Sequence, residues 1–70
     1  MVEVFKTNVL QQDQAMKLVS ILQEYYPGSR INFDLEDCDK ILRIQHQELD
    51  TAEIAPLLNQ FGFACEPLED

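Results

Sequence analysis

Hydrophobic and polar residues alternate along two short stretches that flank an acidic turn in the middle of the chain. In the first stretch, Ile31, Phe33 and Leu35 fall on one side and polar residues fall on the other. Leu42 and Ile44 continue the apolar set after the turn. Because successive side chains of a strand point to opposite faces, the pattern predicts a hairpin with one covered face and one polar face.

A strand and a helix are predicted before this hairpin. Residues 2–7 alternate and are interpreted as the first strand. From Gln12 to Tyr26, apolar residues recur at intervals of three and four, which is typical of a helix with one buried face. Pro27-Gly28 is its stop signal, because proline cannot continue the helical hydrogen bonds and glycine accepts the left-handed C-terminal geometry.

A second helix is predicted after the hairpin. Asp50 is a suitable capping residue, and Gly62 marks the end of the apolar stripe. Since Pro56 lies too deep for the first turn of a helix capped by Asp50, we expect the helix to begin nearer Glu53. Phe63 to Glu66 is then predicted to form a short fourth strand.

These elements predict an α+β fold. With strands at Arg30–Glu36 and Lys40–His46, the order is βαββαβ, which gives a ferredoxin-like sandwich. The expected antiparallel sheet has the strand order 4-1-3-2 and both helices on one face. Its other face would be open and would carry the polar residues Asn32, Asp34, Glu36 and Arg43. Residues 1–70 are predicted to be one domain, with 66–70 as a frayed tail.

The chain is strongly acidic. Its 70 residues include 13 Asp or Glu and five Lys or Arg, for a formal net charge of -8. Because nucleic acids and anionic lipid surfaces are bound largely through Lys and Arg, we expect neither nucleic acid nor membrane as a partner. The favoured partner is a protein with a basic surface.

Two features point to a cytoplasmic protein. No apolar run approaches the length of a membrane span, and no charged-then-apolar leader precedes the first strand. The two cysteines are too few for a disulfide framework and are typical of a reducing compartment.

With its elements placed, the chain resembles the heavy-metal-associated (HMA) domain of copper chaperones and metal-transporting ATPases over nearly its whole length. The second half carries most of the likeness, in segments that look like the family's closing helix and the Gly-aromatic pair after it: Leu42-Arg43-Ile44, Glu53-Ile54, Leu58 and Phe61-Gly62-Phe63. The resemblance implies the ferredoxin-like fold. In the family, a Gly-Met-x-Cys-x-x-Cys loop after the first strand binds a soft metal such as Cu(I).

The thiols of that loop are missing here. The motif falls on residues 8–14, which read Asn-Val-Leu-Gln-Gln-Asp-Gln, so Gln11 and Gln14 stand at the two cysteine positions. Soft cations require thiolate donors, and a glutamine amide is a neutral, hard oxygen donor. We therefore expect the family's fold without its metal, and no other cofactor.

No second chemical site is expected. Cys38 lies in the hairpin turn and Cys65 on the fourth strand, at opposite edges of the sheet, while His46 lies at the far end of the third strand. These residues should form neither a metal site nor a disulfide within one chain. With one histidine, no nucleophile–base pair and no Gly-rich phosphate loop, the chain is not expected to be an enzyme.

One end of the predicted fold is the candidate site. There the loop after the first strand, the 37–39 turn and the 62–63 corner should lie together, at the end where HMA domains dock onto partners. This end would present a partner-binding surface made of Gln11, Gln12, Asp13, Asp37, Asp39 and Phe63. The acidic turn lacks the glycine and the spaced glutamate of a calcium loop, so it is either a docking surface or simply a solvated hairpin.

We therefore expect a non-catalytic interaction or regulatory module that binds no metal and uses the acidic end or the open sheet face. The alternative is a metal-handling protein that binds metal between two chains through Cys38 or Cys65. A small-molecule sensor would need a pocket at a dimer interface, and no residue pattern favours it. The sequence leaves the oligomeric state open.

Overall fold

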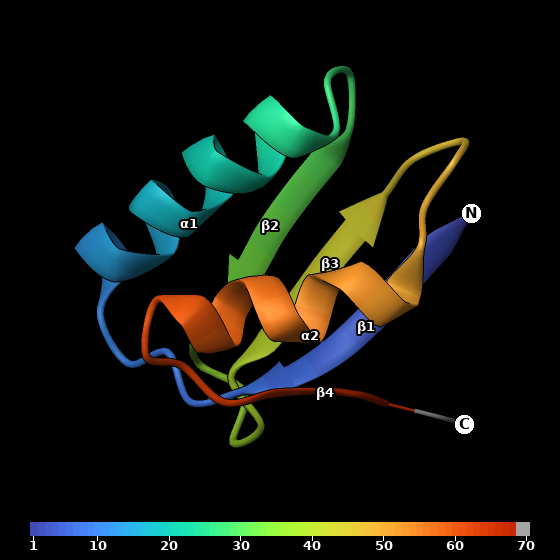
Figure 1. The fold of residues 1–70 in the computed structure, drawn as a ribbon. Coiled ribbons are helices and arrows are strands. Elements are labelled where there is room, and N and C mark those ends of the chain that lie inside the picture. The colour runs from blue at the N-terminus through green and yellow to red at the C-terminus, as the bar shows by residue number, and fades with distance from the viewer. Residues whose placement is uncertain (69–70) are drawn as a thin grey trace.

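The computed structural model describes residues 1–68, which contain four strands and two helices. In chain order these elements are β1 (Val2–Thr7), α1 (Gln12–Tyr25), β2 (Arg30–Asp34), β3 (Ile41–Gln45), α2 (Thr51–Gln60) and β4 (Cys65–Pro67). All strand pairs are antiparallel, the sheet order is β2-β3-β1-β4, and both helices lie on one face (Figure 1). The predicted ferredoxin-like βαββαβ sandwich is confirmed.

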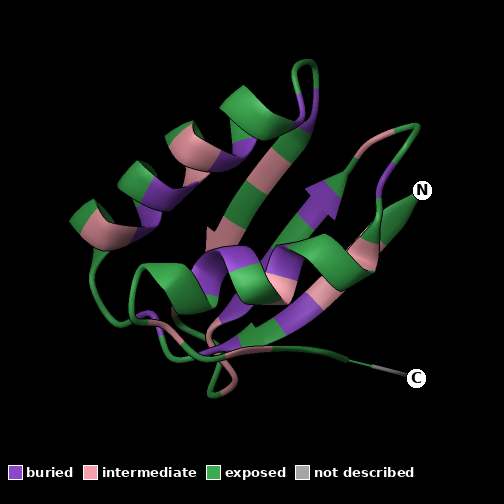
Figure 2. Ribbon diagram, viewed as in Figure 1, coloured by how far each residue is buried: buried purple, intermediate pink, exposed green. Residues whose placement is uncertain are grey.

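The alternation of β2 and β3 divides the hairpin as expected. Leu42 and Ile44 of β3 face the helices and are fully buried, as is Phe5, which pairs with Leu42 from β1. Ile31 and Phe33 face the same way from β2, but they are only half-buried because β2 is an edge strand. Figure 2 shows the buried positions gathered on β1, β3 and the inward sides of both helices.

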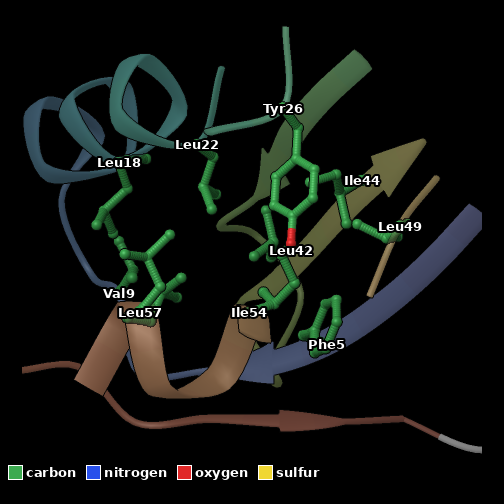
Figure 3. Close-up of a cluster of buried hydrophobic side chains, with 12 residues drawn as sticks. Phe5, Val9, Leu18, Leu22, Tyr26, Leu42, Ile44, Leu49, Ile54 and Leu57 are labelled. Carbon is green, nitrogen blue, oxygen red and sulfur yellow. The ribbon is translucent and has the colours of Figure 1, made fainter. Parts of the chain in front are cut away.

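The core is completed by the apolar stripes of the helices. Figure 3 shows Leu18 and Leu22 of α1 and Ile54 of α2 pointing toward the sheet residues. Burying each such side chain contributes roughly 1.5–3 kcal/mol relative to leaving it exposed. Gly28 and Gly62, after the two helices, have φ values of +83° and +90°, as the predicted stop signals require.

α2 begins earlier than predicted. Its first residue is Thr51, not a residue near Glu53, because the Asp50 side chain accepts a hydrogen bond from the Ala52 N–H at 3.0 Å and caps the helix there. Pro56 therefore lies inside α2 and cannot donate to the Ala52 carbonyl. Since Ala52 is exposed, water can satisfy that carbonyl.

The hairpin strands are shorter than predicted. β2 ends at Asp34 and not at Glu36, and β3 begins at Ile41 and ends at Gln45. The reason is the turn between them, which takes up residues 35–40 with local hydrogen bonds of its own.

The last strand is displaced toward the C-terminus. β4 covers Cys65–Pro67 and not Phe63–Glu66, and it pairs Glu66 with Lys6. The Leu68 N–H also donates to the Val4 carbonyl at 2.9 Å. The structure therefore corrects the frayed-tail prediction for residues 66–68, because pairing with β1 satisfies their backbone; Glu69 and Asp70 lie outside the described residues.

The open sheet face is less polar than expected. Cross-strand pairing places Val2 and Val4 of β1 beside Gln45 and Arg43, and Val2 is 57% exposed. Three of the five basic residues of the chain share this face by the alternation of their strands: Lys6, Arg30 and Arg43. Asp34 and Glu66 share the face by the same alternation, so it mixes valines with charges of both signs.

Tyr26 joins the two helices at the opposite end of the domain from the acidic turn. Its ring is buried, its hydroxyl donates to Glu53 Oε2 at 3.0 Å, and its ring lies edge-on to His46 with centroids 5.5 Å apart. Burial, together with the hydrogen bond to Glu53, raises the pKa of Tyr26 to about 12.

This shift predicts a loss of stability at alkaline pH. The pKa of an unfolded tyrosine is about 10, so the Tyr26 hydroxyl stays protonated to a higher pH in the folded state than in the unfolded state. The stabilisation is fully present below pH ~10 and is lost as the pH rises through the folded value of about 12. In urea unfolding at a series of pH values, we expect the free energy of unfolding to fall more steeply above pH ~10 for the native chain than for Tyr26→Phe.

The control for this experiment is Tyr25→Phe, since Tyr25 is 61% exposed and the hydrogen bond to Glu53 comes from Tyr26. It should follow the native pH dependence. Parallel curves for the native chain and Tyr26→Phe would contradict the assignment.

Candidate functional site

The turn between β2 and β3 is acidic and stiffened by its own side chains. Asp34 Oδ1 accepts the Glu36 N–H at 3.2 Å, and Asp37 Oδ1 accepts the Asp39 N–H at 2.9 Å. The Lys40 N–H closes the turn on the Asp37 carbonyl at 3.0 Å. Such carboxylate–backbone bonds hold turns in one shape, so the exposed Glu36 and Asp37 are presented in a defined position.

The lysines near this turn leave most of its charge unneutralised. Lys40 has a φ of +48°, and its Nζ donates to the Leu35 carbonyl at 2.8 Å, so this ammonium is held on the backbone of the turn. Lys6 Nζ lies 3.8 Å from Asp39 Oδ1, which is the single ion pair within residues 1–68. Because both partners are partly exposed, this pair contributes little.

A buried threonine connects the turn to the loop that precedes α1. The Thr7 N–H donates to the Asp39 carbonyl at 3.0 Å, and the Thr7 hydroxyl donates to the Lys40 carbonyl. The same hydroxyl accepts the Val9 N–H at 3.3 Å, and Val9 itself is fully buried. One side chain thus fixes the acidic turn relative to the start of the β1–α1 loop.

An asparagine connects the third segment of this end. Asn8 Oδ1 accepts the Ala64 N–H at 2.8 Å, and Asn59 Nδ2 donates to the Phe63 carbonyl at 2.8 Å. The loop after β1, the 37–39 turn and the corner before β4 therefore meet at one end of the domain, as predicted (Figure 1). We call this region the acidic end: residues 8–13, 36–39 and 61–64.

Most of the predicted partner-binding residues are exposed at the acidic end: Gln11, Gln12 and Asp13 around the start of α1, and Asp37 in the turn, with Asp39 half-buried. Phe63 is different, because it is half-buried against the core. The large apolar side chains exposed at this end are Leu10, at 70%, and Phe61, at 45%.

The sequence offered only a weak signal for these two residues. Leu10 lies between a strand and a helix, outside both periodicities, so nothing assigned its side chain to a face. Phe61 directly follows α2 at the helical spacing of its apolar stripe, a position that favours the core over the surface. Because both side chains are exposed within the acidic end, Leu10 and Phe61 are added to the candidate site as its apolar contact area.

The donors at the motif positions do not form an evident metal site. Gln11 is exposed, and Gln14 lines a groove between the helices with Phe61 and Phe63. Neutral amides in these places do not supply the thiolates that soft metals need.

Within residues 1–68, one group of three potential ligands is close enough to approach a cation: Asp37, Cys38 and Asp39, whose ligand atoms lie within 4.8 Å of one another. The group combines two hard carboxylates with one soft thiol, and Asp37 already accepts a backbone hydrogen bond. Cys65 and His46 belong to no such group in the described part of the chain, and both cysteines are free.

Cys65 and His46 are engaged elsewhere. Cys65 is half-buried, and burial together with the nearby Glu66 raises the pKa of its thiol to about 11, so it is protonated at neutral pH and a poor metal ligand. His46 Nε2 hydrogen-bonds the Pro27 carbonyl, and Nδ1 accepts the Glu48 N–H, both at 3.1 Å.

No family model matches this chain, and no curated protein or solved structure matches it. None of the helices in residues 1–68 combines the length and apolar character that crossing a bilayer requires.

Proposed function

We propose that this chain is a non-catalytic, HMA-like interaction or regulatory module whose acidic end docks onto a basic surface of a partner protein. The observation that carries the proposal is the acidic turn, in which Glu36 and Asp37 are exposed and whose backbone is held by Thr7. A preorganised surface loses little conformational freedom on binding, which favours recognition. Leu10, exposed in the loop that Thr7 connects to the turn, supplies apolar contact area.

Charge favours the acidic end over the open sheet face for a basic partner. The open face carries Lys6, Arg30 and Arg43 together with Asp34 and Glu66, so it offers a basic partner no excess of negative charge. The acidic end carries Asp13, Asp37 and other carboxylates in exposed positions, which would attract it and speed the encounter.

The proposal includes the absence of a bound metal and a cytoplasmic location. Gln11 and Gln14 replace the thiols of the HMA motif, and Cys65 is a protonated, half-buried thiol. Two unpaired cysteines are typical of a reducing compartment.

The proposal predicts where a basic ligand binds. When the ¹⁵N-labelled chain is titrated with an oligolysine peptide, we expect the largest amide shifts in residues 10–13 and 36–39. The variant D37N/D39N should weaken binding about fivefold, since two exposed ion pairs are lost. An asparagine at position 37 still accepts the Asp39 N–H through its side-chain carbonyl, so the turn is retained.

A matched control changes the net charge equally at other sites. E24Q/E48Q also removes two negative charges, from exposed residues outside the acidic end, and should weaken binding less than twofold. Equal effects of the two double variants, or shifts spread evenly over all carboxylates, would show non-specific attraction and refute the docking site.

A second candidate function is metal binding between two chains through Cys38, favoured by the proximity of Asp37 and Asp39 to its thiol. Zinc or Cu(I) titration followed by sedimentation distinguishes the two. Our proposal expects no stoichiometric metal-dependent dimer. A dimer that forms with metal and is lost in Cys38→Ser, but not in Cys65→Ser, would replace it.

A further inference from the structure

The two edges of the sheet differ in how they are protected. β4 is three residues long and ends in Pro67, and both features discourage pairing with another strand. β2 is five residues long, contains neither proline nor glycine, and within residues 1–68 pairs only with β3. Its outer edge therefore presents unpaired backbone groups suited to accept a further strand.

An uncharged groove of about 360 Å³ runs beside this edge, between β2 and α1. Met16, which is 63% exposed, and Val19 line it from α1, opposite Ile31 and Phe33 of β2. No charged side chain is among its lining residues, which are Gln12, Ala15, Met16, Val19, Ser20, Ile31, Asn32 and Phe33. Charged residues make up 26% of the chain, so an uncharged groove is unusual on its surface. Because the groove has no carboxylates, it does not repel another acidic molecule.

We infer that β2 pairs antiparallel with β2 of a second copy of this chain, with Asn32 on the two-fold axis. In this register Arg30 lies opposite Asp34 of the second copy, and the symmetry makes this ion pair twice. Ile31 lies opposite Phe33 of the second copy on the helix side, and the two Asn32 amides meet on the open face.

The charge pattern selects this register and this occupant. Shifting the pairing by two residues removes the match between Arg30 and Asp34, while shifting it by one turns the apolar residues to the wrong face. Within residues 1–68 neither Arg30 nor Asp34 has an ion-pair partner in its own chain. A second copy supplies both partners and covers the uncharged groove, whereas a basic protein would meet Arg30 and find no carboxylate in the groove.

The test is sedimentation of the chain from micromolar to millimolar concentration, with reducing agent and chelator present so that disulfides and metal bridges cannot contribute. We expect the mass to rise from that of one chain, 8.1 kDa, toward that of two. R30D should raise the dimer dissociation constant at least about tenfold, because two cross-strand attractions become repulsions. The double variant R30D/D34R restores both pairs with exchanged signs and should recover the native constant.

Two further measurements keep the outcome unambiguous. R43D changes the charge of the same face by the same amount on an interior strand and should leave the dissociation constant nearly native. Amide exchange in residues 30–34 of the native chain should slow as concentration rises. A chain that stays monomeric to millimolar concentration, or a dimer that R30D weakens no more than R43D, would overturn the inference.

Discussion

Leu42→Ala is expected to lower the free energy of unfolding by about 3 kcal/mol, the cost of removing a large side chain from a well-packed core. Leu42 is fully buried on β3, an interior strand, and it pairs with Phe5 on one side and Phe33 on the other. No exposed edge allows its neighbours to collapse into the space that is left. Since a domain of this size has roughly 3–5 kcal/mol of net stability, the variant should be largely unfolded at elevated temperature.

The measurement is urea unfolding followed by circular dichroism, with Leu10→Ala as the control. Leu10 is the same residue type but is 70% exposed, so its truncation should change stability by less than about 0.5 kcal/mol. If the two substitutions had similar effects, Leu42 would not lie in the core and the covered face of the sheet would be assigned incorrectly.

Thr7→Val is expected to cost about 1–3 kcal/mol, although valine has nearly the same shape as threonine. The substitution leaves the Lys40 carbonyl and the Val9 N–H without the hydroxyl that both now use. Because Thr7 is buried, water cannot readily replace these bonds. The loss of stability should be largest at the acidic end, where we expect faster amide exchange in residues 36–40 and in the loop after β1.

The conservative variant Thr7→Ser separates the hydroxyl from the packing. It keeps both hydrogen bonds and should restore most of the stability and the slow exchange of the turn. If Thr7→Val weakened oligolysine binding while Thr7→Ser did not, the result would show that the proposed docking depends on the fixed conformation of the turn. Uniformly faster exchange, including residues 46–50 at the opposite end, would show only a global loss of stability.

The proposed docking site and the inferred self-association are compatible. An antiparallel β2 pair places the two acidic ends at opposite ends of one continuous sheet, because each copy runs in the reverse direction. Such a dimer would present two acidic ends to a partner with repeated basic surfaces, and linkage of two weak contacts raises the overall affinity.

Local patterns were sufficient to predict most of the fold. The alternation of Leu42 and Ile44 with polar residues, and the three-to-four spacing in α1, depend only on the geometry of a single strand or helix. The positions of Gly28 and Gly62 also follow from the backbone conformation of one residue. These features predicted the element order, and the order restricts the topology to very few choices.

The candidate site was predicted less completely. Topology alone brought Asp37 and Asp39 to the same end as Gln11, because chain connections place those loops together. It placed Phe63 on the exposed surface, whereas the structure half-buries Phe63 and exposes Phe61, because their burial depends on how the corner after α2 packs against α1. The role of Thr7 was missed for the same reason: the Lys40 carbonyl, to which its hydroxyl donates, is 33 positions away in the sequence.

By itself the sequence determined the order and type of the helices and strands, which sides of the hairpin and of the helices are apolar, and that residues 11 and 14 are glutamines. The tertiary structure decided the start of α2 at Thr51, the shift of β4, and the combination of Val2 and Arg43 on one open face. The physical reason is the distance along the chain over which each kind of interaction acts. Periodicity and capping act within a few residues, whereas strand register, edge exposure and shared hydrogen bonds depend on segments that meet only after folding.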